Sequence, residues 1–77
     1  MAAGEARHLR DVLARNVRML RQERKLSQEQ LADASGLHRT YVGSIERSER
    51  NVSLDSLNAL ATGLSTEVWS LLQPKRD

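Results

Sequence analysis

The apolar residues of this sequence recur every three or four positions along most of its length, and its single proline, Pro74, follows the last of these repeats. Such spacing places apolar side chains on one face of an α-helix. Proline interrupts helices because it lacks the backbone N–H and its ring clashes with the preceding turn. Phe is absent, and Tyr and Trp occur once each, so leucine must fill the core. The sequence therefore predicts an all-α fold.

The length of 77 residues allows one domain, near the lower end of what folds on a single hydrophobic core. The chain has no cysteine, and its two histidines, His8 and His38, are far apart without ligand spacing around them. We therefore expect no disulfide, no metal site and no cofactor. No apolar stretch approaches the roughly 20 residues of a membrane span, and no signal-peptide core is present. The expected location is the cytoplasm.

The pattern predicts one folded domain over residues 8–73 with a short tail on either side. Residues 1–7 show no apolar repeat and are expected to form a flexible N-terminal tail. The first helix is predicted from Leu9 to Arg24 or Lys25, because its apolar residues fall on one helical stripe. Residues 74–77 are expected to form the C-terminal tail.

Two short helices joined by a glycine turn are predicted next. Ser27 is a natural N-cap, and Gln30 three residues later completes a capping box. Gly36 is placed to end this helix in the left-handed conformation that glycine adopts without penalty. Another helix follows Leu37. Such a helix pair can present its second member to the DNA major groove.

The second helix of this pair has a polar outward face. Val42 and Ile45 define its buried side, and at about 100° per residue the positions most nearly opposite carry no large apolar side chain. Those positions are Thr40, Gly43, Ser44 and Arg47. A glycine inside a helix costs roughly 1 kcal/mol relative to alanine. We interpret this face as one that lies against another molecule, and the predicted partner is double-stranded DNA.

Basic residues are concentrated in the first fifty positions, which hold ten Lys and Arg against seven acids. Residues 51–77 hold two bases and three acids. Ten of the twelve bases are arginine, whose guanidinium donates two parallel hydrogen bonds to phosphate or guanine. A solvated surface would show the same charge pattern, so the charges support a nucleic-acid partner without establishing it.

Two further helices are predicted after a polar connector. Ser53 caps a fourth helix that ends near Gly63, and Ser65 or Thr66 starts a short fifth helix that Pro74 stops. The apolar residues at the end of the chain exceed what a small core needs, so we expect them to pair two copies. They are Leu64, Val68, Trp69, Leu71 and Leu72. For Trp69, packing on the core of one chain is an equal alternative.

The twenty residues from Gln28 to Arg47, QEQLADASGLHRTYVGSIER, resemble the helix-turn-helix of the Cro and phage-repressor family, the xenobiotic-response-element type. Ser35 departs from the family pattern, in which an apolar residue is commoner. The longer stretch HRTYVGSIERSERNVSL is similar to controller proteins of restriction–modification systems. The resemblance runs from about Leu13 to Leu64 and implies a compact five-helix lambda-repressor-like DNA-binding domain.

The resemblance also implies roles for individual residues. The base-reading positions are Arg39, Thr40, Gly43 and Ser44. The positions that the resemblance places on the DNA backbone are Gln28, Arg47, Arg50 and Asn51. His38 and Tyr41, at the start of the same helix, are expected to reach phosphates as well. Arg21 and Glu46 match a pair that forms an internal salt bridge between the first and third helices. Packing alone is the alternative for Tyr41, and helix capping is the alternative for His38.

The implied function is that of a sequence-specific transcriptional regulator that binds a near-palindromic operator as a homodimer. It would block or recruit RNA polymerase on the bacterial nucleoid, as an autoregulatory controller of a restriction–modification system. The alternatives are a general or phage-type repressor, an antitoxin of the same fold, and a protein-interaction module that does not bind DNA. We expect no enzyme activity, because no strained nucleophile turn or oxyanion site is recognisable. No small-molecule effector is expected either.

Overall fold

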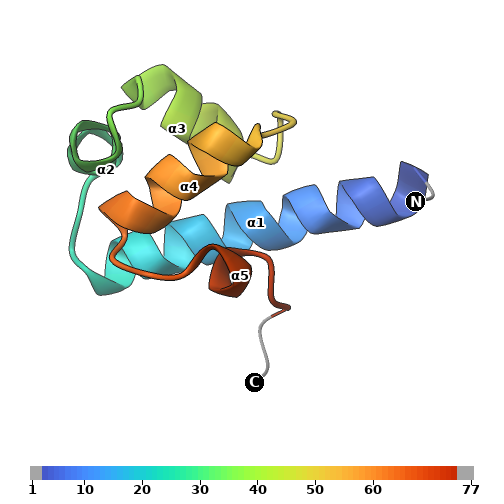
Figure 1. Cartoon of the computed structure of the whole chain (residues 1–77). Helices are drawn as coiled ribbons and strands as arrows, with labels where there is room; N and C mark the ends of the chain where they lie inside the picture. The colour runs from blue at the N-terminus through green and yellow to red at the C-terminus, as the bar shows by residue number, and fades with distance from the viewer. Residues whose placement is uncertain (1–2, 75–77) are drawn as a thin grey trace.

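The structure, a computed structural model, describes residues 3–74, with side chains from Arg7 onwards. This part of the chain contains five helices and no strand. They are α1 (Ala3–Glu23), α2 (Gln28–Ser35), α3 (Arg39–Glu46), α4 (Leu54–Gly63) and α5 (Val68–Leu71). Helix α1 packs against α3 and α5, and α2 packs against both α3 and α4, whereas the first half of α1 projects past the other helices (Figure 1). The all-α fold class is confirmed.

The first helix is longer than predicted. It begins at Ala3, so the prediction of a tail is wrong for residues 3–7, while residues 1 and 2 lie outside the described part. Alanine and glutamate, which favour helices, precede Leu9, and the helix therefore continues beyond the turns that pack on the core. Its other end is close to the prediction. Lys25 adopts a left-handed conformation, with φ of 58°, and the helix ends at Glu23.

The predicted helix ends around the glycine turn are confirmed. The Ser27 hydroxyl accepts a hydrogen bond from the Gln30 amide at 3.0 Å, and the Gln30 side chain accepts one from the Ser27 amide at 2.8 Å. Gly36 has φ of 68°, the left-handed conformation expected of the residue that ends α2. Ser53 caps α4 by accepting from the Ser56 amide at 3.1 Å. Local chemistry therefore sets these boundaries.

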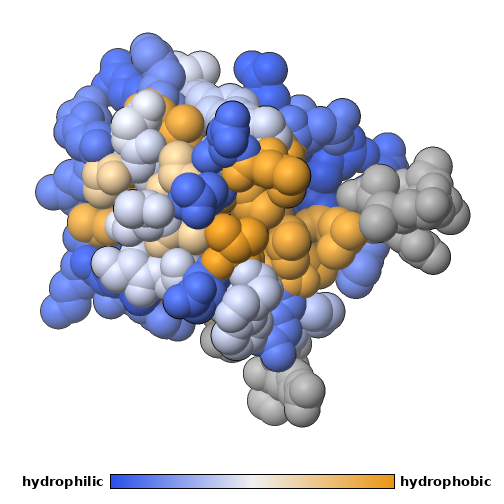
Figure 2. All heavy atoms as spheres, in the orientation of Figure 1, coloured by the Kyte–Doolittle hydropathy of each residue, from blue (hydrophilic) through white to orange (hydrophobic). Residues whose placement is uncertain are grey.

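Two large apolar side chains are not covered by the fold. Leu54, the first residue of α4, is 82% exposed, and Trp69 in α5 is 64% exposed. Figure 2 shows hydrophobic surface gathered on the face that carries the start of α4, the first half of α1 and α5, within a largely hydrophilic surround. This surface is hereafter the apolar face.

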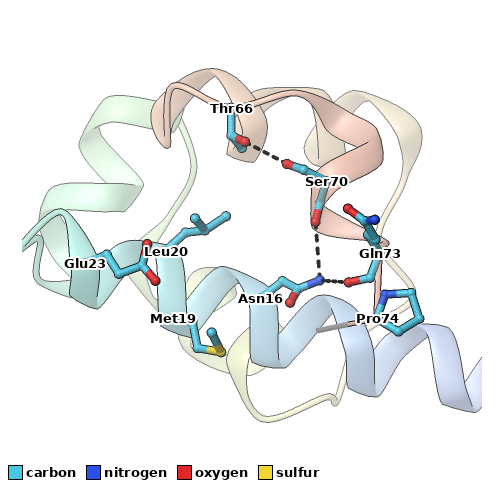
Figure 3. Close-up of a pocket in the computed structure, with 8 residues that line it drawn as sticks. All are labelled: Asn16, Met19, Leu20, Glu23, Thr66, Ser70, Gln73 and Pro74. Carbon is cyan, nitrogen blue, oxygen red and sulfur yellow. Dashed lines mark hydrogen bonds between the residues drawn. The ribbon is translucent and has the colours of Figure 1, made fainter. Parts of the chain in front are cut away.

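The short helix α5 is held to α1 by a buried asparagine. Nδ2 of Asn16 donates toward the carbonyl oxygens of Leu71 at 2.9 Å and Gln73 at 2.8 Å, with that of Ser70 at 3.4 Å (Figure 3). These atoms lie beside a groove between α1 and the C-terminal segment. Because α5 has four residues and no side-chain N-cap bond, the Asn16 amide supplies contacts that the helix itself lacks.

The end of α4 explains why α5 begins later than predicted. Ser65 adopts a left-handed conformation, with φ of 54°. The amide of Ser65 donates to the Thr62 carbonyl at 3.1 Å, and the amide of Thr66 donates to the Ala61 carbonyl at 2.9 Å. These bonds complete the end of α4. The prediction that α5 starts at Ser65 or Thr66 is therefore wrong, and its first residue is Val68.

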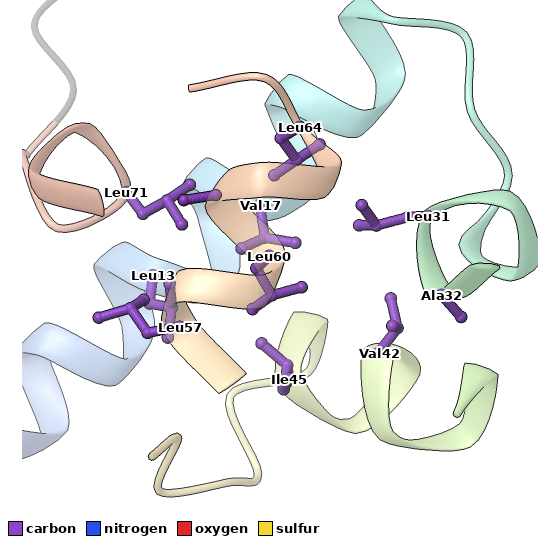
Figure 4. Close-up of a cluster of buried hydrophobic side chains, with 11 residues drawn as sticks. Leu13, Val17, Leu31, Ala32, Val42, Ile45, Leu57, Leu60, Leu64 and Leu71 are labelled. Carbon is purple, nitrogen blue, oxygen red and sulfur yellow. The ribbon is translucent and has the colours of Figure 1, made fainter. Parts of the chain in front are cut away.

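The hydrophobic core is built from all five helices, and the buried residues at its centre face one another between α1, α4 and the helix pair (Figure 4). Leu64 and Leu71 are completely buried within this core. The prediction that these two residues form a dimer interface is therefore wrong, because α5 folds back on α1 and its inward side belongs to the single chain. Val68 and Leu72 are half-buried against the core.

Helices α2 and α4 approach each other closely at Ser35 and Gly63. A Cβ atom added to Gly63 would collide with the Ser35 hydroxyl and lie 3.2 Å from the Ser35 amide nitrogen and 3.3 Å from the Ala34 carbonyl carbon. The Ser35 hydroxyl is buried without a hydrogen-bond partner among the described residues. The small serine and the glycine together permit this close crossing.

Candidate nucleic-acid interface

Helix α3 begins at the edge of the molecule farthest from α1 and ends closer to it (Figure 1). Val42 and Ile45 are buried in the core, as their spacing predicted, and fix the inner side of the helix. Arg39, Thr40 and Arg47 are exposed. The helix therefore presents polar and basic side chains to solvent at its two ends, whereas residues 42–46 are buried.

A shallow hollow separates the start of α2 from the outer side of α3. It is lined by residues of three helices and the N-cap of α2: Arg21, Ser27, Gln28, Glu29, Arg39, Thr40, Gly43 and Arg47. Most of the predicted base-reading and backbone-binding residues of α2 and α3 thus share one concave surface. This hollow and its rim are hereafter the reading surface.

Gly43 forms part of the floor of the reading surface. A Cβ atom at this position would lie 3.2 Å from Nη1 of Arg47 and 3.4 Å from Oε1 of Gln28. Both atoms are at the ends of flexible side chains, so they can move aside. Gly43 was predicted on the outward face of the helix, but it is buried, because two longer side chains lie over it.

Arg21 and Glu46 form the predicted internal salt bridge between α1 and α3. Nε of Arg21 lies 2.6 Å from Oε2 of Glu46, and Nη2 lies 3.0 Å from Oε1. A third donor from Arg21, Nη1, reaches the carbonyl of Leu26 at 2.8 Å. The guanidinium fork and carboxylate plane therefore meet in the bidentate geometry that makes such pairs strong. This prediction is confirmed.

Gln28 connects the reading surface to that salt bridge. Its Nε2 donates to Oε1 of Glu46 at 3.1 Å, although the residue as a whole is exposed. The carboxylate of Glu46 consequently receives hydrogen bonds from α1 and α2 while it belongs to α3. This one buried carboxylate therefore links α1, α2 and α3.

Ser44 lies inside the fold, contrary to the prediction that it reads a base. It is 4% exposed, and its hydroxyl donates to the Tyr41 carbonyl at 2.8 Å and accepts from Nε of Arg50 at 3.1 Å. The loop after α3 covers it, since the Glu49 amide also donates to the Ser44 carbonyl at 3.0 Å. Ser44 points away from Val42 on the helix, but a neighbouring segment occupies that direction.

The two outer arginines of α3 each pair with a glutamate. Nη1 of Arg39 donates to Oε2 of Glu29 at 3.0 Å, and Nε of Arg47 donates to Oε1 of Glu49 at 3.2 Å. All four side chains are more than half exposed. Exposed pairs of this kind contribute about 0–1 kcal/mol to stability. The glutamates were not selected from the sequence, because their partners lie ten and two residues away and no helical spacing links them.

The remaining predicted backbone-binding residues do not line the reading surface. Nδ1 of His38 accepts a hydrogen bond from the Thr40 amide at 3.1 Å, so this side chain caps α3. The Arg50 guanidinium lies over the Tyr41 ring, 5.7 Å from its centroid. Oδ1 of Asn51 accepts from Nη1 of Arg10 at 2.7 Å, which ties the loop after α3 to α1.

A helix pair joined by a left-handed glycine, with exposed basic residues at both ends of its second helix, defines a helix-turn-helix protein. The family model described as helix-turn-helix matches residues 17–68, which is more than half of the chain. The chain belongs to this family. None of its helices, within the described range, combines the length and apolar character needed to cross a bilayer.

Several relatives of the chain are controller proteins. Control protein C.SmaI from Serratia marcescens is 58% identical over 64 residues, which cover 83% of this chain and 76% of the relative. The solved restriction–modification controller protein C.AhdI from Aeromonas hydrophila is 47% identical, with a TM-score of 0.78, and the match covers 80% of this chain and 94% of that one. The chain is thus similar to helix-turn-helix regulators of transcription, in sequence and in structure.

A third controller protein, C.Esp1396I, is 33% identical in its wild-type structure, with a TM-score of 0.76, and the match covers 83% of this chain and 86% of that one. Its solved variants replace one arginine, one threonine and one tyrosine that follow one another directly in its sequence. Arg39, Thr40 and Tyr41 stand in the same order at the start of α3.

Proposed function

We propose that this protein is the autoregulatory controller of a restriction–modification system, which binds a near-palindromic DNA operator as a homodimer. The observation that carries the proposal is the reading surface. It places Arg39, Thr40 and Gly43 in one hollow beside the start of α2, while the opposite side of α3 is buried. A cytoplasmic protein associated with the nucleoid accords with this function.

Base reading is assigned to the first turn of α3. The Arg39 side chain is 68% exposed, and its guanidinium can donate two hydrogen bonds to O6 and N7 of a guanine. Thr40 is exposed next to it, and the floor at Gly43 admits a base edge once the tips of Gln28 and Arg47 move aside. The Arg-Thr-Tyr order shared with C.Esp1396I, whose variants alter these residue types, supports this assignment.

Backbone contacts are assigned to residues around that turn. Phosphate contacts orient a protein on the duplex and carry no sequence information directly. Each neutralised phosphate makes binding more sensitive to salt, with a log–log slope of about −0.9. The proposed set lies at the start of α2, at both ends of α3 and in the following loop: Gln28, His38, Tyr41, Arg47, Arg50 and Asn51.

The apolar face is proposed to bind a second copy of the chain. Trp69 and Leu54 are its exposed anchors, with Val68 and Leu72 half-buried beside the core. Tryptophan is enriched among residues that dominate interface energies. One helix-turn-helix reads only a few base pairs, and a symmetric pair doubles the site by placing two recognition helices about 34–36 Å apart. The dimer would act by occupancy, excluding RNA polymerase from one site and recruiting it at another.

Selection from random oligonucleotides tests the proposal. The native protein should enrich one sequence with two inverted halves, and that duplex should then bind in the presence of excess random DNA. Sedimentation of the complex should show two chains on each site. Enrichment of no sequence, or binding that random competitor abolishes, would contradict the proposed function. Neighbouring genes for a methyltransferase and an endonuclease would support the controller role specifically.

A further inference from the structure

Glu29 has no role among the contacts that the proposed function assigns, although it lines the reading surface. It belongs to the first turn of α2, and its Oε2 accepts a hydrogen bond from Nη1 of Arg39 at 3.0 Å. A carboxylate at a surface that binds DNA repels the phosphates, so by itself it weakens binding to every sequence. Its position beside the base-reading arginine calls for a physical explanation.

We infer that Glu29 is a specificity-determining positioning residue that acts through Arg39; this inference rests on the proposed function. A guanidinium carries five N–H donors. Among the described residues, the one hydrogen bond made by Arg39 uses a single nitrogen, Nη1. Enough donors remain for the two parallel bonds to O6 and N7 of guanine. Arg39 can therefore read a guanine while Glu29 still holds it.

The same pairing penalises contacts that carry no sequence information. An unpaired arginine at the edge of the groove binds any phosphate and releases a counterion, which raises affinity for all sequences. Arg39 paired with Glu29 is a unit without net charge. If Arg39 breaks this pair to bind a phosphate, the Glu29 carboxylate is left unpaired close to the DNA. Glu29 thus increases discrimination by making the wrong partner unfavourable.

The helix N-terminus keeps the carboxylate in place. Glu29 lies in the first turn of α2, where the unpaired amides and the helix dipole favour a negative charge. The α2 backbone is itself anchored, because Leu31 and Ala32 are buried in the core. The contact with Glu29 therefore holds the Arg39 guanidinium at a fixed position relative to α2. Without it, only the flexible arginine side chain on α3 would position the guanidinium.

The Arg47–Glu49 pair offers a matched control. Its nitrogen–oxygen distance is 3.2 Å, and its side chains are 59% and 56% exposed, close to the values of 68% and 64% for Arg39 and Glu29. Arg47 lies at the end of α3, where the proposed function assigns a phosphate contact. Removing the charge of Glu49 should therefore strengthen binding to all DNA alike.

The test compares the native chain with Glu29→Gln and Glu49→Gln. Dissociation constants are measured for the duplex selected by the native chain and for a random duplex, over a range of salt concentrations. We expect Glu29→Gln to raise affinity for the random duplex several-fold, to steepen its salt slope by about 0.9, and to lower the ratio of selected to random binding. Glu49→Gln should strengthen binding to both duplexes and leave the ratio of selected to random binding unchanged. If Glu29→Gln also leaves the ratio unchanged, the inference is overturned.

A second arm repeats Glu29→Gln in an Arg39→Ala background. Because Glu29 acts through Arg39, the substitution should then leave the ratio as it is in Arg39→Ala alone. An equal fall of the ratio in both backgrounds would overturn the inference. The behaviour of the native chain separates failure of the proposed function from failure of the role of Glu29. If it fails to discriminate between the two duplexes, the proposed function fails; if it discriminates and Glu29→Gln does so equally, only the role of Glu29 fails.

Discussion

Arg21 of α1 and Glu46 of α3 form a bidentate ion pair whose carboxylate is 4% exposed and whose guanidinium side chain is 14% exposed. Gln28 of α2 donates to the same carboxylate at 3.1 Å. Three helices therefore meet at one charged group, directly beneath the reading surface. The angle at which α3 is presented depends on a group that is itself shielded from solvent.

Arg21→Met should destabilise the fold strongly. Removing one partner leaves the buried Glu46 carboxylate unpaired, and such losses cost about 3–5 kcal/mol. Urea denaturation would measure the change in the free energy of unfolding. Arg39→Met is the matched control, because its pair with Glu29 is exposed and contributes at most about 1 kcal/mol. If the two substitutions lower the free energy of unfolding equally, the buried pair contributes no more to stability than the exposed one, and the prediction is wrong.

Arg39→Ala and Arg47→Ala should differ in their effect on sequence discrimination. Loss of a bidentate contact to guanine costs roughly 1–3 kcal/mol at the selected site and little on random DNA. Arg47→Ala removes a phosphate contact, so it should weaken both complexes similarly and reduce the salt slope by about 0.9. Fluorescence anisotropy with labelled selected and random duplexes measures both quantities. Parallel losses for Arg39→Ala would contradict its base-reading role.

Gly43→Ala and Gly63→Ala should change stability in opposite directions. At Gly43 the added methyl meets the movable ends of Arg47 and Gln28, and the helix gains up to about 1 kcal/mol in propensity. At Gly63 it meets the α2 backbone at Ser35, where overpacking costs about 1–3 kcal/mol. Thermal unfolding distinguishes the two. Gly43→Ala should also weaken operator binding, and unchanged affinity would refute close approach of DNA at that residue.

Trp69→Ala and Leu54→Ser should shift the chain toward monomer without unfolding it. Both side chains are mostly exposed, so the single chain loses little packing when they are shortened. Sedimentation over a range of protein concentrations measures the dimer dissociation constant, and circular dichroism checks the fold. Asn58→Ala, at an exposed position of α4, is the control. An unchanged dissociation constant in both variants would place the dimer interface elsewhere.

Asn16→Asp should release α5 from α1. The carboxylate has the size of the amide but donates no hydrogen bond, and it would face the carbonyl oxygens of Leu71 and Gln73. An unsatisfied buried group costs about 1–3 kcal/mol, and more when it is charged. Trp69 is the only tryptophan and lies in α5, so its fluorescence reports this helix directly. If the Trp69 fluorescence of Asn16→Asp changes only when the whole domain unfolds, α5 has stayed attached and the expectation is contradicted.

Much of the reading surface could be predicted from the sequence. The exposed positions of Arg39, Thr40 and Arg47 follow from a buried stripe of Val42 and Ile45, because a helix with one buried side must turn its other side outward. The family resemblance supplied the Arg21–Glu46 pair, which no spacing rule within one helix could have indicated.

The misassigned residues share one cause. Ser44 lies on the predicted outer side of α3, but the loop that carries Arg50 folds over it. Leu64 and Leu71 were assigned to a dimer, but α5 turns back and buries them in the core of one chain. In each case the deciding neighbour comes from another segment, so the periodicity of the helix itself contains no information about it.

The amino-acid sequence by itself determined where helices α2 and α4 begin and where α2 ends, since Ser27, Gly36 and Ser53 act on backbone groups within a few residues of themselves. Only the tertiary structure decided which polar side chains remain accessible and which carboxylate accompanies each arginine. Burial and ion pairing depend on distances between segments remote in the chain, and those distances exist only after the helices have packed.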